Sequence, residues 1–115
     1  MKTIMNNLKR ATIEMVLLSL LCEEDMYGYQ IAQQLKKRSN NEYAVLEGSM
    51  YPILYRLNEK GCVTFESRQI TEKLTRVYYH ITDEGKQYLQ EVREYYMHCV
   101  ESINQLAKCD CSEQA

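Results

Sequence analysis

The chain has very little proline, no long apolar run and no secretion signal. Pro52 is the one proline in 115 residues. No apolar stretch approaches the roughly 18 to 20 residues that a membrane span requires. Residues 1–20 lack the apolar block and the small-residue cleavage site of a signal peptide. We therefore expect a cytoplasmic protein with no membrane partner.

Catalytic motifs are missing as well. The sequence has no G-x-S-x-G, no P-loop and no H-E-x-x-H, and neither of its two histidines lies near a candidate nucleophile in the sequence. We predict no catalytic residues and no cofactor, and we look for a binding function instead.

The five cysteines include no C-x-x-C pair, and their odd number argues against a disulfide framework. We expect Cys22 and Cys62 to be buried packing residues. The side chains with metal-ligand chemistry that lie together in the sequence are His98, Cys99, Cys109 and Cys111. Their C-x-C spacing is a weak zinc signature, so we predict no metal site. A metal-responsive or thiol-responsive role for Cys109 and Cys111 stays open as an alternative.

Charge is distributed unevenly along the chain. The net charge is -2 overall, but residues 48–81 carry more basic than acidic side chains, and residues 82–115 carry more acidic ones. A polyanion is therefore expected to meet the middle segment. The length suits one small domain with a modest core, residues 1–115, for which a homodimer is expected.

Apolar spacing predicts two helices in the first third of the chain. Residues 6–22 are apolar around much of the helix circumference, which indicates burial on more than one side. The polar stretch EEDM ends that helix. A second helix is predicted from residue 27, with three basic residues in its last turn at 36–38, and the stretch SNNEY is a loop.

The third predicted helix contains the proline. Ser49 is a good N-cap, which would place Pro52 in the first turn, where no intrahelical hydrogen bond is lost. Apolar residues recur at helical spacing on one side of this helix, and Lys60 and Gly61 close it. The outward face then presents Pro52, Tyr55 and Glu59, flanked by Tyr51 and Arg56.

The rest of the chain predicts a hairpin and one long helix. Residues 62–68 and 76–81 have strand character around a polar tip, and Thr82 is a suitable N-cap for the last helix. The last helix carries an a/d heptad seam. We predict a mostly α protein with a small β-hairpin, a winged helix-turn-helix over residues 6–81 and a long C-terminal dimerisation helix over residues 82–108. The expected dimer interface comprises Leu8, Met15, Leu89, Val92, Tyr96, Cys99, Ile103 and Leu106.

Three ordered blocks resemble the PadR-like transcriptional regulators. They are MYGYQIAQQL (26–35), GSMYPILYRLNEKGCV (48–63) and TRVYYHITDEGKQYL (75–89). The resemblance runs from about residue 7 to residue 106. It implies a dimeric DNA-binding regulator, commonly a repressor, whose partner is a double-stranded operator. The resemblance does not specify the signal, for which a small-molecule inducer is one candidate.

The resemblance also implies which residues meet DNA. The third helix would contribute Ser49, Tyr51, Pro52, Tyr55 and Arg56, and the wing would contribute Lys73 and Arg76. The wing RQITEKLTR contains Glu72 and only three basic residues, where many members of the family are more basic. Its contact with DNA is therefore expected to be weak.

Two alternatives stay open at this point. The acidic overall balance also suits a winged-helix module that binds another protein through the same face. The ten tyrosines are expected mainly as core or interface rings, but they also allow an aromatic ligand pocket between the first and last helices.

Overall fold

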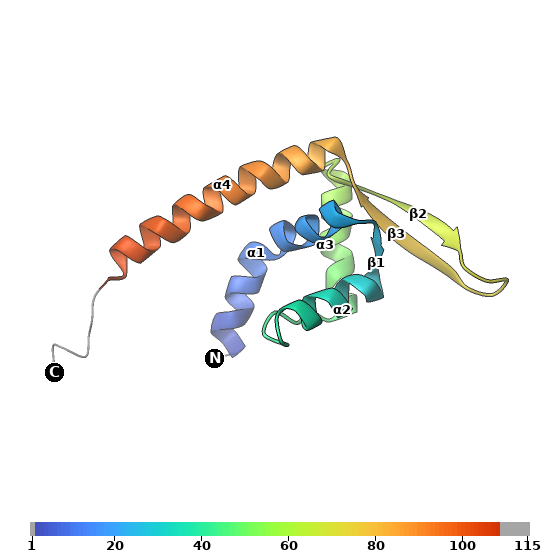
Figure 1. The fold of residues 1–115 in the computed structure, drawn as a ribbon, viewed down its shortest axis with the longest axis horizontal. Helices are drawn as coiled ribbons and strands as arrows, with labels where there is room; N and C mark the ends of the chain where they lie inside the picture. The colour runs from blue at the N-terminus through green and yellow to red at the C-terminus, as the bar shows by residue number, and fades with distance from the viewer. Residues whose placement is uncertain (1, 109–115) are drawn as a thin grey trace.

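The computed structural model describes residues 2–108, which form four helices and a small antiparallel sheet (Figure 1). The elements in chain order are α1 (Lys2–Glu23), β1 (Met26–Tyr27), α2 (Gly28–Arg38), α3 (Glu47–Glu59), β2 (Val63–Gln69), β3 (Thr75–Ile81) and α4 (Asp83–Leu106). The predicted fold class, mostly helical with a small hairpin, is confirmed. Within residues 2–108, no helix is both long enough and apolar enough to cross a membrane.

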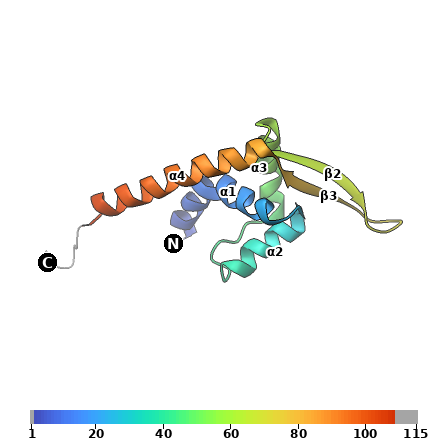
Figure 2. The same ribbon diagram turned by 45° about the horizontal axis from the view of Figure 1, so that its top comes forward.

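The core lies where α1, α2, α3 and the base of the sheet meet. Leu17 and Leu18 of α1, Ile31 of α2 and Leu57 of α3 are almost completely buried. The hairpin projects from one end of this core, and α4 runs away from it toward the other end, as Figures 1 and 2 both show. Much of α4 therefore lies outside the core of its own chain.

The sheet has three strands in the order β1-β3-β2, all antiparallel. The predicted hairpin of β2 and β3 is confirmed, with Val63 opposite Ile81 and Phe65 opposite Tyr79. The third strand, β1, was not predicted. It has only two residues, too few for an alternating pattern to be recognised, and it forms because Met26 pairs with Tyr79.

The start of α3 differs from the prediction. Leu46, in extended conformation, is the N-cap of the helix, and Ser49 is its third residue and makes no capping hydrogen bond. Pro52 is therefore the sixth residue, in the second turn, so the expectation that it lies in the first turn was wrong. Glu47 in the first turn suits the positive end of the helix dipole. Proline at the sixth position leaves the carbonyl of exposed Gly48 without its helical partner.

The junction between the hairpin and α4 is closely packed. As predicted, Thr82 is the N-cap of α4: its hydroxyl accepts a hydrogen bond from the Gly85 amide and donates one to the Gly61 carbonyl. A Cβ at Gly85 would lie 2.2 Å from the Cys62 carbonyl oxygen and 2.8 Å from Ile81 Cγ1. Only glycine allows α4 to start this close to the strands. Cys62 is buried as expected, whereas Cys22 at the end of α1 is exposed, against the prediction.

We predict that Gly85→Ala lowers the free energy of unfolding by about 1 to 3 kcal/mol, because the new methyl group must push α4 away from the hairpin. Urea unfolding at one fixed protein concentration measures this. Gly48→Ala is the matched control, since a Cβ there meets nothing within 4 Å and removes backbone entropy from the unfolded chain. It should leave stability unchanged or raise it by up to about 1 kcal/mol. Equal effects of the two substitutions would contradict the close packing.

Candidate nucleic-acid interface

The outward face of α3 is set by what its inner face buries. Met50, Leu54 and Leu57 are 0 to 1% exposed. The opposite side is accessible, with Tyr51 43% and Tyr55 61% exposed. The α3 residues predicted to meet DNA are all exposed, and they are Ser49, Tyr51, Pro52, Tyr55 and Arg56.

A hollow of about 620 Å³ separates one flank of α3 from the hairpin. The sheet register places Phe65 and Ser67 opposite Tyr79 and Val77 on the face of the hairpin that looks toward α3. No charged side chain lines the hollow, which is formed by Gly48, Tyr51, Pro52, Leu54, Tyr55, Phe65, Ser67, Val77 and Tyr79. Aromatic rings and small polar groups of this kind can pack against sugars and base edges.

Phe65 belongs to this surface, although sequence reasoning did not single it out. Phe65 is the only phenylalanine of the chain, and its side chain is 53% exposed. The alternation in residues 62–68 placed it on the same face as Val63. The strand extends beyond the core, which leaves Phe65 exposed, and the alternation of residues alone did not show this.

Tyr51 is engaged within its own helix. Its hydroxyl donates a hydrogen bond to the Glu47 carboxylate at 2.5 Å. This hydrogen bond, together with partial burial and the negative charge of Glu47, raises the pKa of Tyr51 from 10 to about 12. The phenol therefore stays protonated at neutral pH, and it must leave Glu47 before it can donate to a phosphate.

Gly28 explains where the Tyr51 ring lies. A Cβ at Gly28 would be 2.8 Å from the Tyr51 hydroxyl oxygen and 3.2 Å from two of its ring carbons. The glycine at the start of α2 thus leaves room for the ring of α3 to fold over it. The Gly-Tyr block at the start of the second helix has a steric role in addition to any chemical one.

The two wing cations lie in different places. Lys73 is exposed at the tip of the hairpin, where its backbone amide donates to the Thr71 hydroxyl. The Arg76 guanidinium instead stacks on the ring of Tyr27, 4.4 Å from its centroid. Arg76 pairs with Arg68 across the strands, so both belong to the face of the sheet that looks away from the aromatic hollow. The structure does not bring Arg76 together with the predicted residues of α3.

A polar network fixes the outer face of the hairpin to the end of α1. Asp25 accepts a hydrogen bond from Arg68 at 2.8 Å and lies 2.7 Å from Nδ1 of His80. The hydrogen bonds with His80 first, and with Arg68, lower the pKa of the Asp25 carboxyl group despite partial burial. Arg68 also pairs with Glu66 and covers the Tyr78 ring. This network holds the base of the wing in one orientation.

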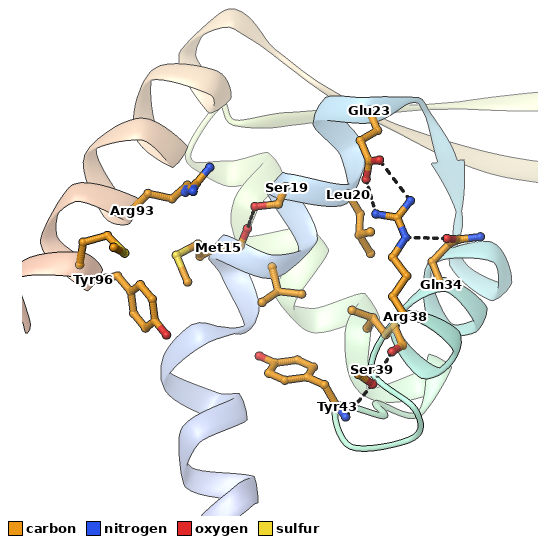
Figure 3. A pocket seen from close by; sticks show the side chains of 13 residues that line it. Met15, Ser19, Leu20, Glu23, Gln34, Arg38, Ser39, Tyr43, Arg93 and Tyr96 are labelled. Atoms are coloured by element: carbon orange, nitrogen blue, oxygen red, sulfur yellow. Dashed lines mark hydrogen bonds and ion pairs between the residues drawn. The ribbon is translucent and has the colours of Figure 1, made fainter. Parts of the chain in front are cut away.

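A second hollow, of about 380 Å³, lies between α1, α2 and α4 (Figure 3). Met15 of α1, Tyr43 of the loop after α2, and Arg93 and Tyr96 of α4 point toward it. This hollow corresponds in position to the aromatic ligand pocket that the tyrosine content allowed between the first and last helices.

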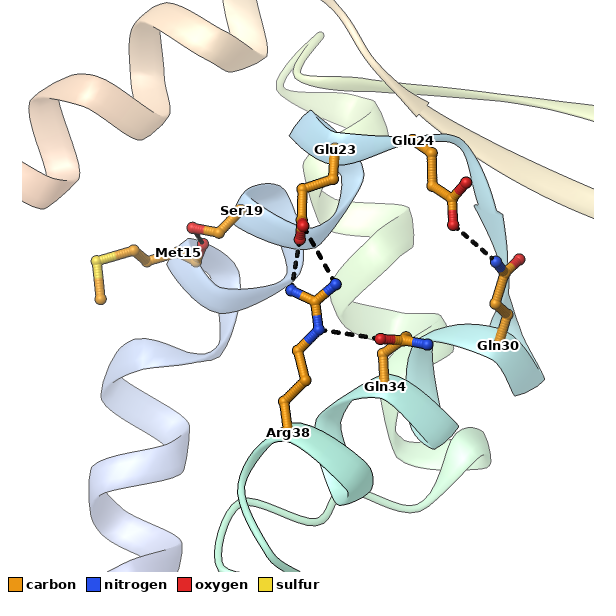
Figure 4. Close-up of polar contacts among 7 residues, drawn as sticks. All are labelled: Met15, Ser19, Glu23, Glu24, Gln30, Gln34 and Arg38. Carbon is orange, nitrogen blue, oxygen red and sulfur yellow. Dashed lines mark hydrogen bonds and ion pairs between the residues drawn. The ribbon is translucent and has the colours of Figure 1, made fainter.

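The rim of this second hollow is polar. Arg38 makes a two-pronged ion pair with Glu23 at 2.6 and 3.1 Å and also donates to Gln34 (Figure 4). Hydrogen bonding to Arg38 lowers the pKa of Glu23. The two charges at the rim neutralise each other, and the wall of the hollow is largely apolar because residues such as Met15, Leu20 and Leu35 line it.

The predicted dimer residues divide into two groups. Leu89 is buried within its own chain and Val92 is half-buried, because this part of α4 packs on α1. Further along α4, Tyr96 is 42%, Ile103 58% and Leu106 86% exposed. Of the remaining predicted residues, Leu8 and Cys99 are exposed and Met15 is half-buried.

The metal-responsive or thiol-responsive role left open for the C-terminal cysteines concerns residues outside the described range. Cys109 and Cys111 are not among residues 2–108, and within that range no three metal-ligating side chains come together.

The sequence matches the family described as "Transcriptional regulator PadR-like family" over residues 17–91. A curated relative, uncharacterized protein X of Lysinibacillus sphaericus, is 34% identical over 83 residues, which are 72% of this chain and 76% of that protein. A crystal structure of a PadR family transcriptional regulator from Eggerthella lenta superposes with a TM-score of 0.85 at 27% identity, covering 95% of this chain and 93% of the other.

The negative transcriptional regulator PadR of Bacillus subtilis is a further relative, 29% identical over 79 residues, which are 69% of this chain and 43% of that protein. The crystal structure of Bacillus subtilis PadR in complex with operator DNA has a TM-score of 0.64 at 29% identity and covers 70% of this chain. The chain spans less than half of the PadR chain in that complex, 46%.

We predict that Glu47→Gln lowers the pKa of Tyr51 from about 12 toward 10, because an uncharged amide accepts the phenol hydrogen bond more weakly than a carboxylate does and no longer repels a phenolate. Alkaline titration of the tyrosine Cζ resonances by NMR reports this value. Glu59→Gln, at the other end of α3, is the control and should leave Tyr51 unchanged. An unchanged titration in Glu47→Gln would mean that the carboxylate does not hold the phenol.

Proposed function

Because the chain belongs to the PadR-like family of transcriptional regulators, we propose that it is a homodimeric, sequence-specific DNA-binding repressor relieved by a small-molecule signal. The observation that carries the proposal is the exposed aromatic and basic face of α3 beside the hairpin. The fold that presents this face is shared with Bacillus subtilis PadR, whose structure was determined with operator DNA. The family and the solved structures that resemble this chain are transcriptional regulators and not enzymes, in agreement with the prediction of no catalytic residues.

In this proposal α3 enters the major groove and the hairpin meets the flanking backbone. Tyr55 and Pro52 occupy the middle of the outward face, where they would contact base edges and sugars. Ser49 and Arg56 would donate to phosphates or to a guanine edge. Tyr51 would join them once its hydroxyl leaves Glu47, at the cost of that short hydrogen bond.

The wing would contribute affinity more than sequence choice. Lys73, exposed at the tip, would meet a phosphate. Arg76 is proposed as a second phosphate contact, reached only where the backbone passes the outer face of the hairpin, because its guanidinium stacks on Tyr27.

We assign DNA contact to residues 6–81 and dimerisation to residues 82–108, with help from Leu8 and Met15 of α1. The apolar residues Tyr96, Ile103 and Leu106 are exposed within one chain, and covering them with a second α4 removes that apolar surface from water. Two α3 helices in such a dimer would read half-sites about one helical turn apart on an inverted repeat.

The signal would act through the hollow between α1, α2 and α4. Its apolar wall with Tyr43 and Tyr96 suits an aromatic molecule, and the Arg93 guanidinium suits an acidic group on it. The hollow touches both α2, which packs on α3, and α4, which carries the dimer seam. An occupant can therefore alter the spacing of the two recognition helices.

We predict that the protein binds a fragment selected from sheared genomic DNA of its source organism, with an affinity that falls steeply between about 50 and 200 mM salt. Tyr55→Ala should weaken this binding by about 1 to 3 kcal/mol, and Tyr55→Phe, which keeps the ring, by less. Fluorescence anisotropy measures both. If no fragment is enriched at low salt, the proposal fails, and the alternative of a winged-helix module that binds another protein is favoured.

We predict that Ile103→Asp converts the dimer into a monomer at micromolar concentration, because a buried, unpaired carboxylate is costly at an apolar interface. Light scattering coupled to gel filtration gives the mass. Gln105→Asp, on the opposite side of α4, is the control and should remain dimeric. A wild-type monomer, or a dimer that survives Ile103→Asp, would exclude this seam as the interface.

A further inference from the structure

A third hollow lies between the first half of α1 and the flank of α3 that faces away from the hairpin. Its volume is about 480 Å³. The residues that line it are Asn6, Lys9, Arg10, Ile13, Ala44, Val45, Leu46, Ser49, Ile53 and Arg56. Three of these side chains are cationic and none is a carboxylate.

The positive charges in this hollow are not neutralised by the chain itself. Glu14, one turn after Arg10, pairs with Lys60 at 3.1 Å and accepts a hydrogen bond from Tyr88, so it is drawn toward α4 and away from Arg10. Within residues 2–108, neither Arg10 nor Arg56 makes an ion pair. The two guanidinium groups therefore keep their donors available for an anion.

The wall of the hollow is held in place without DNA. Lys9 Nζ donates to the Ala44 carbonyl at 2.8 Å, which ties the loop before α3 to α1. The Tyr43 hydroxyl donates to the Lys9 carbonyl at 3.2 Å and lies 2.6 Å from the Thr12 hydroxyl. The cationic side chains thus surround a site whose backbone is already fixed.

The position of the hollow relates it to the proposed DNA face. Tyr51 and Tyr55 line the aromatic hollow on the hairpin side of α3, whereas Ser49 and Arg56 line this one on the other side. The two hollows flank one helix. On α1, Arg10 follows Leu8 by two residues, about 200° around the helix, so the hollow faces away from the proposed dimer contact of Leu8.

We propose that this hollow binds a phosphate of the DNA backbone at the edge of the major groove opposite the wing, with Arg10 and Arg56 as its two charged donors. The inference rests on the proposed function and adds Arg10 of α1 to the interface. A guanidinium fork matches a phosphate in a charge-assisted, bidentate contact. Ser49 and Asn6 supply further donors, and α3 is then held between one backbone contact at α1 and another at the wing.

The test compares the salt dependence of DNA binding in matched variants. Fluorescence anisotropy is measured with the selected fragment and with a scrambled duplex of the same length, for wild type, Arg10→Ala, Arg10→Lys and Lys86→Ala. Lys86→Ala removes the same charge from α4, outside this hollow. Thermal melting of each variant establishes that it is folded.

Arg10→Ala is expected to weaken binding to both duplexes by the same factor and to reduce the slope of log affinity against log salt by about 0.9. Arg10→Lys should restore the slope, and Lys86→Ala should leave it at the wild-type value. A slope in Arg10→Ala equal to that of wild type overturns the proposal.

Two further outcomes are distinguishable. If the wild type shows no salt-sensitive DNA binding, the proposed function itself fails and this inference fails with it. If the wild type binds DNA, Arg10→Ala keeps the full slope, and inorganic phosphate at constant ionic strength raises the melting temperature of wild type but not of Arg10→Ala, the hollow takes a free anion and the DNA-backbone assignment is wrong.

Discussion

The burial of the inner face of α3 is the constraint on which the rest of the molecule depends. Met50, Leu54 and Leu57 pack into the core with Leu17, Leu18 and Ile31. Each fully buried side chain of this size contributes roughly 1.5 to 3 kcal/mol, which is a large share of the stability of a small domain. A rotation of α3 would expose all three at once. The rotational setting of the helix, and with it the set of residues that faces outward, is therefore fixed before any ligand is present.

Two glycines allow close packing that fixes how α2 and α4 lie relative to α3 and the hairpin. Gly28 lets the Tyr51 ring lie over the start of α2, and Gly85 lets α4 begin directly against the hairpin. The Asp25 network with Arg68 and His80 then secures the outer face of the wing. The base of the hairpin, α3 and the start of α4 are thus packed closely together, and the tip of the hairpin and the second half of α4 extend away from them.

Periodic features of the chain were predictable from the sequence. The helical spacing of Met50, Leu54 and Leu57 identified the buried face of α3, and strand alternation identified the hairpin. A polar hydroxyl at the right place identified Thr82 as a cap. Each of these signals is local, because it depends on residues within a few positions of one another.

The features that the sequence did not predict depend on distant or unusual contacts. Asp25 meets His80 across 55 positions, and the two-residue strand β1 exists only because β3 lies beside it. The helix α3 begins at Glu47 although Ser49 is the better cap by type: Leu46 holds the N-cap position, and its carbonyl accepts a hydrogen bond from the Ser49 amide at 2.9 Å. The sequence could name Arg56 as a candidate contact, but only the fold brings Arg10 of α1 to its side.

We propose that the outward face of α3 is the surface that reads DNA. Amide chemical-shift changes in ¹⁵N-labelled protein, with and without the selected duplex, test it most directly. We expect the largest changes at residues 47–59, at the hairpin tip near Lys73 and around Arg10, with little change in the second half of α4. Changes concentrated in α4, with α3 unaffected, would contradict it.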